Sequence, residues 1–152
     1  MQRIVGHVVG ADIRPHIFLG PVGQRVEFRH RMRRVLFLHM QFGARGGLGA
    51  ELPVNPQGRV YYSLPMLDLT VPTLSQCLEA AQAIERLRHH GPLLVCCALG
   101  YSRSATAVAA WLLISQRAET IDQALAIIGA ARPRVVLHAA HRNVLEALVH
   151  VH

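Results

Sequence analysis

One stretch of sequence decides the fold of this chain: Leu93-Leu94-Val95-Cys96-Cys97-Ala98-Leu99-Gly100-Tyr101-Ser102-Arg103-Ser104. The apolar run over 93–96 predicts a buried strand, and the nearly uninterrupted apolar segment over 104–115 predicts a buried helix. A loop between them wraps its backbone N–H groups around a point at the helix N-terminus, where those donors and the helix dipole attract a tetrahedral anion. We therefore expect a phosphate-binding loop made by Ala98, Leu99, Gly100, Tyr101, Ser102 and Arg103.

Cys97 lies at the mouth of this predicted loop, and five residues separate it from Arg103. A cysteine beside a helix N-terminus ionises more readily than a free thiol, so we expect Cys97 to be a thiolate near neutral pH. A thiolate that faces a bound phosphate group is a nucleophile facing its electrophile. The pattern thus indicates covalent phosphoryl transfer, with a buried cysteine and an unrelated surface arginine as the alternative interpretation.

These residues resemble the signature of cysteine-based protein phosphatases, in which a cysteine, five residues and an arginine are followed by serine or threonine. The run Gly100-Tyr101-Ser102-Arg103-Ser104 is most similar to the dual-specificity branch. The resemblance covers residues 61–148 and is weaker over 1–60, and the whole chain, 1–152, has the length of a single domain. It implies a phosphatase that needs no metal or other cofactor.

The resemblance implies a role for each of four side chains. Cys97 attacks phosphorus and forms a phosphocysteine, while Arg103 holds two phosphate oxygens with its planar fork. Ser104 hydrogen-bonds the sulfur and helps it leave. The family takes its general acid from an upstream loop, and Asp68, at the end of an apolar segment, is the candidate here. A residue that caps a turn after a strand is the alternative interpretation of Asp68.

Cys96 departs from the family pattern, which usually has histidine immediately before the nucleophile. The hydrogen bonds of that histidine favour the thiolate, so its replacement leads us to expect weaker activity or an optimum at higher pH. We interpret Cys96 as a small buried core residue. Redox regulation is the alternative, although adjacent cysteines form only strained disulfides.

The rest of the chain predicts an α/β domain with a central, mostly parallel sheet and helices on both faces. Strands are expected at 13–20, 35–38 and 59–67. A capping-box pattern at 73–76 begins a helix that ends near 90, and the same pattern at 120–123 begins another that ends near 132. A last helix is expected over 138–149. Cys77 and Trp111 are interpreted as core residues, and Tyr101 as a candidate for the pocket mouth.

The chain is strongly basic, with a formal net charge of +7. Its surface should therefore attract anions, and a phosphorylated protein is the partner that we expect. All its basic residues other than histidine are arginine, which suggests a bacterial coding sequence rich in G and C. Five arginines cluster at 25–34. We favour a solvated face over a phosphate or nucleic-acid contact, because the chain has no nucleic-acid-binding motif.

Cysteine and histidine usage points to a chain without disulfides or metal. Three cysteines, two of them adjacent, do not form a secreted disulfide framework. There is no secretory signal pattern, and the longest apolar run, 105–114, is too short to span a bilayer, so the cytoplasm is the expected location. His138 and His141 have the spacing of two metal ligands but no third in sight, and we favour a solvated helix face.

The leading hypothesis is hydrolysis of phosphotyrosine, with phosphoserine and phosphothreonine as further substrates. Phosphoinositide phosphatases are an alternative, although their loops commonly carry lysines that this loop lacks. RNA 5′-phosphatases share the scaffold, and the basic segment at 25–34 keeps that alternative open. A non-catalytic phosphopeptide-binding module is the alternative from a different class. The sequence does not distinguish a complete protein from a fragment of a larger one, and it does not specify the oligomeric state.

Overall fold

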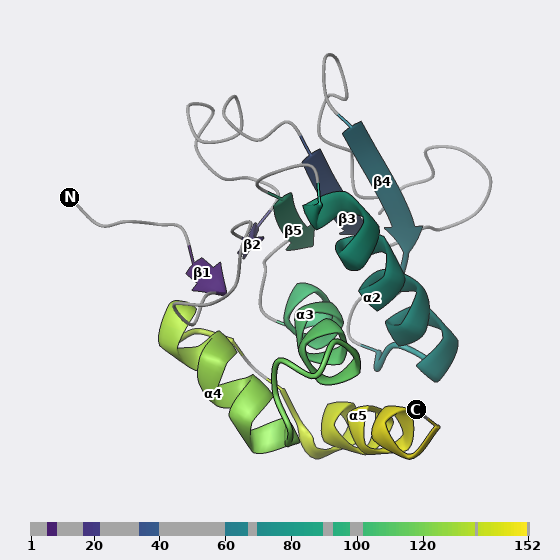
Figure 1. Cartoon of the computed structure of the whole chain (residues 1–152), viewed down its shortest axis with the longest axis vertical. Helices are drawn as coiled ribbons and strands as arrows, with labels where there is room; N and C mark the ends of the chain where they lie inside the picture. The colour runs from purple at the N-terminus through teal and green to yellow at the C-terminus, as the bar shows by residue number, and fades with distance from the viewer. Residues whose placement is uncertain are drawn as a thin grey trace.

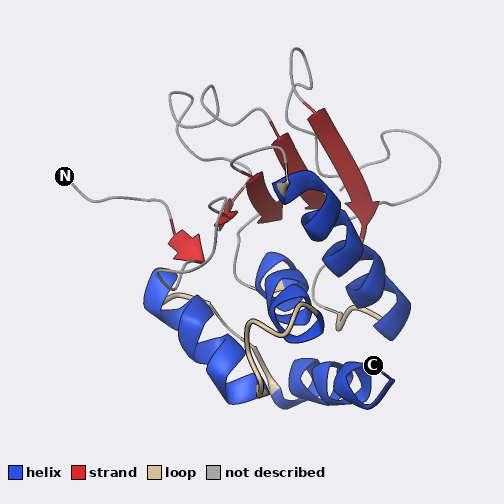
Figure 2. Ribbon diagram, viewed as in Figure 1, coloured by secondary structure: helices blue, strands red, loops and turns tan. Residues whose placement is uncertain are grey.

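A computed structural model gives the fold for residues 6–8, 17–21, 34–39, 60–66, 70–89, 93–97, 102–135 and 137–151, and the account below is confined to them. The strands are β1 (Gly6–Val8), β2 (Ile17–Pro21), β3 (Arg34–His39), β4 (Val60–Pro65) and β5 (Leu93–Cys97). The helices are α2 (Leu74–Arg88), α3 (Arg103–Ile114), α4 (Ile121–Ala131) and α5 (Ala139–Val151). Figure 1 shows their arrangement, and Figure 2 separates them by type.

The strands form one five-stranded sheet in the order β1-β2-β5-β3-β4. Only β1 is antiparallel, to β2, and the remaining strands pair in parallel. The predicted central, mostly parallel sheet is therefore confirmed. β5 is its middle strand, with β2 on one side and β3 on the other. The carboxyl ends of parallel strands share one edge of a sheet, which is where ligands of α/β proteins bind.

Every residue of β5 is buried, so neither face of this strand is exposed to solvent. Leu93, Val95 and Cys97 belong to the main hydrophobic core together with residues of α2 and α3. Side chains alternate along a strand, so Leu94 and Cys96 point to the opposite face, where they are also buried. The predicted strand over 93–96 extends one residue further than expected, to Cys97.

The described helices form a single layer. α2 and α3 pack against each other and both contact β5, and α3 also contacts α4 and α5 (Figure 1). Within the described part of the chain, helices thus cover one of the two sheet faces on which we expected them. No helix in this part is both long enough and apolar enough to cross a membrane.

The N-terminus of α2 has the predicted capping box. The Thr73 hydroxyl accepts a hydrogen bond from the Gln76 backbone N–H at 3.2 Å, and the Gln76 side chain accepts one from the Thr73 N–H at 2.9 Å. These two bonds satisfy helix-end donors that have no partner within the helix. Cys77, on the same helix, is 0% exposed, which confirms its assignment to the core, and burial raises the pKa of its thiol to about 11.

The pattern at 120–123 forms only half of a capping box. The Thr120 hydroxyl accepts from the Gln123 N–H at 3.1 Å, as predicted. The Gln123 side chain, however, accepts from the Glu119 N–H at 2.8 Å, one residue before the cap. The Gln123 side chain therefore bonds the backbone N–H of the residue before the N-cap, and not that of Thr120 itself. The helix itself, α4, has the predicted extent.

α3 is the buried centre of the helix layer, as its apolar sequence predicted. All residues from Arg103 to Leu112 are buried. Trp111 is 1% exposed, and its indole N–H donates to a carboxylate oxygen of Glu85 on α2 at 2.7 Å. The same carboxylate accepts two hydrogen bonds from Arg88, at 2.7 and 2.6 Å. The Arg88 hydrogen bonds, assisted by the indole donor, hold the pKa of the Glu85 carboxyl at about 2.

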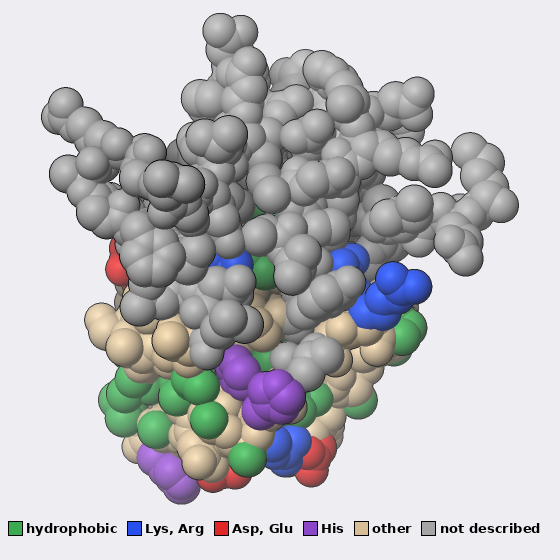
Figure 3. All heavy atoms as spheres, turned by 180° about the vertical axis from the view of Figure 1, so that it is seen from behind, with side chains coloured by type: hydrophobic (Ala, Val, Ile, Leu, Met, Phe, Trp, Pro, Cys, Tyr) green, Lys and Arg blue, Asp and Glu red, His purple; other side chains and the backbone are tan. Residues whose placement is uncertain are grey.

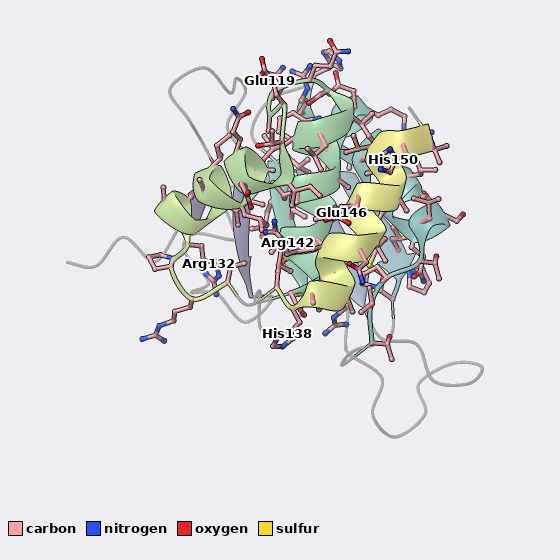
Figure 4. All side chains as sticks on the ribbon, turned by 90° about the horizontal axis from the view of Figure 1, so that it is seen from below. Glu119, Arg132, His138, Arg142, Glu146 and His150 are labelled. Atoms are coloured by element: carbon pink, nitrogen blue, oxygen red, sulfur yellow. The ribbon has the colours of Figure 1, made fainter. Side chains whose placement is uncertain are left out.

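α5 lies beside α3 and runs in the same direction. Leu113 and Ile114, at the end of α3, and Leu148 and Val149, near the end of α5, line one cavity of about 240 Å³. The two helices therefore also begin at a common end, and α5 begins after His138 (Figure 4).

The prediction of a solvated face for His138 and His141 is wrong for His141, which is 7% exposed. The His141 Nδ1 accepts a hydrogen bond from the backbone N–H of His138 at 3.1 Å, so the imidazole satisfies a backbone donor just before α5. Burial, reinforced by the neighbouring His138, lowers the pKa of His141.

Arginine and histidine side chains are exposed on the face shown in Figure 3, in keeping with the basic composition.

Candidate active site

Cys97 is the last residue of the central strand and is 2% exposed. Its backbone pairs with Pro21 of β2, one residue beyond the last pair that β5 makes with β3. Its Sγ lies 3.3 Å from the hydroxyl oxygen of Ser104, in the first turn of α3. When the sulfur is a thiolate, only the hydroxyl can donate in this pair. The predicted cysteine and serine are therefore brought together at the carboxyl edge of the sheet.

Arg103 begins α3 and is 2% exposed, which excludes the alternative of a surface arginine. Its guanidinium Nη1 donates to the backbone carbonyl of Met66 at 3.4 Å. This long hydrogen bond joins the start of α3 to the residue that follows β4. Burial removes water that would screen the guanidinium charge, and the helix N-terminus adds partial positive charge, so the start of α3 is a region of positive potential.

The start of α3 differs from the starts of α2 and α4 in its capping. Thr73 and Thr120 have extended backbones, with ψ angles of 161° and 158°, and each hydroxyl caps its helix. Ser102 has a ψ angle of −58°, and its side chain makes no capping hydrogen bond in the described structure. Its carbonyl instead accepts from the N–H and the hydroxyl of Thr106, each at 2.8 Å. The side chain of Ser102 therefore does not satisfy the backbone N–H groups at this helix N-terminus.

Several predicted site residues lie outside the described residues. They are the candidate acid, Asp68, and four residues of the predicted phosphate-binding loop: Ala98, Leu99, Gly100 and Tyr101. The described chain stops beside them, at Cys97 and Met66, and resumes at Ser102 and Thr70. Their roles stay predictions, while the structure brings Cys97, Arg103 and Ser104 to the end of one strand and the start of one helix.

Gln76 has a second contact that sequence reasoning missed. Its side-chain NH₂ donates to the backbone carbonyl of Pro65, at the end of β4, at 3.1 Å. The capping-box pattern identified Gln76 as a helix-start residue, but no local signal relates it to a carbonyl in the preceding strand. The contact depends on where β4 ends relative to α2, which only the tertiary structure sets.

Cys96 is 0% exposed on the sheet face opposite Cys97, which confirms its interpretation as a core residue. Neighbouring strand side chains point away from each other, a geometry that opposes a bond between the two sulfurs. The described residues contain no group of three or more histidine, cysteine, aspartate or glutamate side chains that could hold a metal ion.

Comparison with protein families identifies this arrangement. Residues 50–149 match the family model of the dual specificity phosphatase catalytic domain. The chain belongs to this family. The dual specificity phosphatase domain is a cysteine-dependent protein phosphatase, and the match includes the strand, the loop and the helix that carry Cys97, Arg103 and Ser104.

Solved structures of phosphatases share the fold of this dual specificity phosphatase. Tk-PTP in its active form is 24% identical, with a TM-score of 0.74 and 99% of each chain covered. Human DUSP28 is 21% identical, with a TM-score of 0.70, covering 97% of this chain and 96% of its own. PTPMT1 in complex with PI(5)P is 22% identical, with a TM-score of 0.68 and coverages of 89% and 90%. No curated protein sequence matches the chain significantly.

Proposed function

We propose that this phosphatase hydrolyses phosphotyrosine in proteins, and phosphoserine and phosphothreonine as well, through a phosphocysteine intermediate. The observation that carries the proposal is the Cys97–Ser104 pair, 3.3 Å apart, beside a buried arginine at an N-terminus that Ser102 does not cap. A thiol, a hydroxyl donor and a guanidinium can supply the nucleophile, a donor to the leaving sulfur and a phosphate-binding group for covalent phosphoryl transfer.

In the first step the Cys97 thiolate attacks phosphorus. The S–P bond forms and the P–O bond to the leaving group breaks, while Arg103 and the loop N–H groups hold the three peripheral phosphate oxygens. Asp68 transfers its proton to the leaving oxygen, which departs as an alcohol or phenol. The products of this step are the phosphocysteine and the Asp68 carboxylate.

In the second step water hydrolyses the phosphocysteine. The Asp68 carboxylate takes a proton from water as the new O–P bond forms, and the S–P bond breaks to release inorganic phosphate. The sulfur leaves as a thiolate. Because the Ser104 hydroxyl lies within hydrogen-bonding distance of this sulfur, it can donate to the developing charge.

The contact between Arg103 and the Met66 carbonyl supports Asp68 as the general acid. It brings the chain two residues before Asp68 to the guanidinium that we propose binds the phosphate. A carboxyl this close along the chain can reach the leaving-group side of a phosphate held by Arg103. If Asp68 instead only caps a turn, its replacement should not change how kcat/KM depends on the leaving group.

A phosphoinositide is the second substrate class to test, because one structure with the same fold is a complex with PI(5)P. The test is therefore phosphate release from matched phosphotyrosine, phosphoserine and phosphothreonine peptides, and from PI(5)P in detergent micelles. We expect the peptides to have the higher kcat/KM. A higher kcat/KM for PI(5)P would contradict the proposed protein substrate and identify a phosphoinositide as the preferred one.

Two variants test the chemistry. Cys97→Ser should reduce turnover of p-nitrophenyl phosphate to background and abolish the phosphoenzyme that acid quenching traps from the parent protein. Asp68→Asn should lower kcat/KM about 10²–10⁴-fold for a substrate with a poor leaving group. Binding of phosphopeptide by the parent without any turnover would instead identify a non-catalytic binding module.

A further inference from the structure

The side chain of Gln76 connects the two ends of the segment that carries Asp68. Its carbonyl oxygen accepts from the backbone N–H of Thr73 at 2.9 Å, and its NH₂ group donates to the backbone carbonyl of Pro65 at 3.1 Å. Pro65 is the last residue of β4, and Thr73 is the N-cap of α2. One amide group thus bridges the end of a strand and the start of the next helix.

The amide of Gln76 matches the chemistry of both contacts. Thr73 presents a donor and Pro65 presents an acceptor, so the side chain must offer both an acceptor and a donor. A glutamate would complete the capping box equally well, but its carboxylate cannot donate to the Pro65 carbonyl. A helix cap alone therefore does not account for glutamine here.

The same segment is held at a third point. Next to Pro65, the carbonyl of Met66 accepts from Arg103 at 3.4 Å. Met66 is 2% exposed, and Pro72, at the other end of the segment, is also buried. The segment over 66–72 is therefore connected at its start to both α2 and α3, and at its end to the capping box.

We propose that Gln76 is a positioning residue of the phosphatase: its bridge between Pro65 and Thr73 fixes the segment over 66–72, so that Asp68 is held at the distance that proton transfer requires. This inference rests on the proposed role of Asp68 as general acid. Gln76 acts only through the segment that it bridges and does not touch the substrate. Small displacements of a catalytic group have large effects on rate, and a shift of 1 Å can cost about 100-fold.

The variant that isolates the bridge is Gln76→Glu, because it keeps the acceptor for Thr73 and removes the donor to Pro65. The assay compares kcat/KM for two aryl phosphates, one that releases a strongly acidic phenol and one that releases phenol itself. The first leaving group departs without protonation, whereas the second needs the general acid. We expect kcat/KM to fall about tenfold for phenyl phosphate and to stay within about twofold for the acidic aryl phosphate.

A second substitution, Gln76→Ala, removes both hydrogen bonds without adding a charge. It should produce the same selective loss together with a lower melting temperature. Agreement between the two variants would show that the glutamate charge is not the cause. Loss of activity by Gln76→Glu that Gln76→Ala does not share would overturn the proposal.

Two control variants separate the bridge from helix stability. Thr73→Ala weakens the same helix N-terminus but keeps the Thr73 backbone N–H and the Pro65 contact, so the ratio of the two kcat/KM values should not change. Gln123→Glu repeats the amide-to-acid change at the start of α4, where the side chain only accepts from Glu119. An equal change of the ratio in either control would mean that Gln76 has only a structural role.

The double variant Gln76→Glu/Asp68→Asn decides whether Gln76 acts through Asp68. If it does, the glutamate adds no further loss once the acid is gone, and the two effects are not additive. If Gln76→Glu still lowers kcat/KM for phenyl phosphate tenfold in the Asp68→Asn background, the inference about Gln76 is refuted while Asp68 remains the general acid. If Asp68→Asn alone has the same ratio of kcat/KM for the two aryl phosphates as the parent, Asp68 is not the acid. The two failures are therefore distinguishable.

Discussion

The N-termini of α2 and α3 are built in opposite ways. α2 is closed by its own residues, with the Thr73 hydroxyl and the Gln76 side chain bonded to backbone N–H groups. α3 is preceded by Ser102, whose side chain does not cap it, and begins with two buried polar residues, Arg103 and Ser104. Both helices have a partial positive charge at this end, and we propose that the N-terminus of α3, which Ser102 does not cap and which we call the open N-terminus, receives the phosphate group.

The difference between the two helix starts separates stability from function. A closed N-terminus contributes to folding, because its donors are satisfied within the chain. The open N-terminus of α3 lies beside the buried Arg103 and the Cys97 thiol, and its role in our proposal is to bind the phosphate group. The predictions below exchange these properties or remove one of them.

Among changes at the two helix starts, the largest effect is expected from Arg103→Lys, which keeps a positive charge at the open N-terminus. Lysine cannot hold two phosphate oxygens with one planar group, so transition-state binding should weaken. We expect kcat/KM for p-nitrophenyl phosphate to fall about 10²–10³-fold. The exposed Arg134 provides the matched control, and Arg134→Lys should retain full activity. Equal activity of both variants would show that charge alone suffices at Arg103.

A capping carboxylate should close the open N-terminus. Ser102→Asp adds a negative charge where a phosphate would bind, and the two repel each other. We expect kcat/KM to fall about 100-fold, mainly through a higher KM, together with weaker inhibition by inorganic phosphate. The control is Thr73→Asp at the start of α2, where an acidic cap should leave the kinetics unchanged. Unaltered phosphate inhibition in Ser102→Asp would place the anion elsewhere.

Removing the hydroxyl beside the sulfur should slow only the second step. Ser104→Ala deletes the group that lies 3.3 Å from the Cys97 Sγ and leaves a residue that suits a buried helix. We expect kcat to fall about tenfold and kcat/KM to change less, because kcat/KM reports the step that forms the phosphocysteine. Rapid-quench measurements should show the intermediate accumulating. A parallel fall of both constants would assign Ser104 to the first step.

Opening the closed N-terminus should affect stability and not chemistry. Thr73→Ala removes the hydroxyl that accepts from Gln76 and should lower the free energy of unfolding by about 1 kcal/mol. Urea unfolding followed by circular dichroism measures this change. The kcat/KM for p-nitrophenyl phosphate should be unaltered, since the Gln76 side chain keeps both of its contacts. A changed kcat/KM would contradict the division between the two helix starts.

The smallest effect concerns the hydrogen bonds that join α2 to α3. Donation from Arg88 and Trp111 holds the pKa of Glu85 at about 2 in the folded protein, against an ordinary value of 4.5. Because the pKa is lowered in the folded protein, the ionised Glu85 stabilises the fold at pH values above 4.5. This contribution is lost as the pH falls from 4.5 through about 2. Glu85→Gln, which still accepts from the indole, should lack this pH dependence. The urea midpoint of the parent should therefore approach that of Glu85→Gln as the pH is lowered from 4.5 to about 2.

Local sequence signals predicted most elements of the fold because they depend on near neighbours. The capping box at Thr73, the apolar run that becomes β5 and the apolar helix α3 are each encoded within a few residues. The short strand β1 was missed, since three residues carry no periodic signal. His141 was misjudged, because its burial comes from packing of the helix layer and not from its own segment.

The sequence by itself determined where three chemical groups lie along the chain: a cysteine at the end of a buried strand, an arginine at the start of a buried helix and a serine after it. Spacing along one strand–loop–helix unit is enough for that. Only the tertiary structure decided what surrounds this unit. The Arg103 bond to Met66 and the Gln76 bond to Pro65 both join residues that are distant in sequence, and such contacts follow from how β4, α2 and α3 pack.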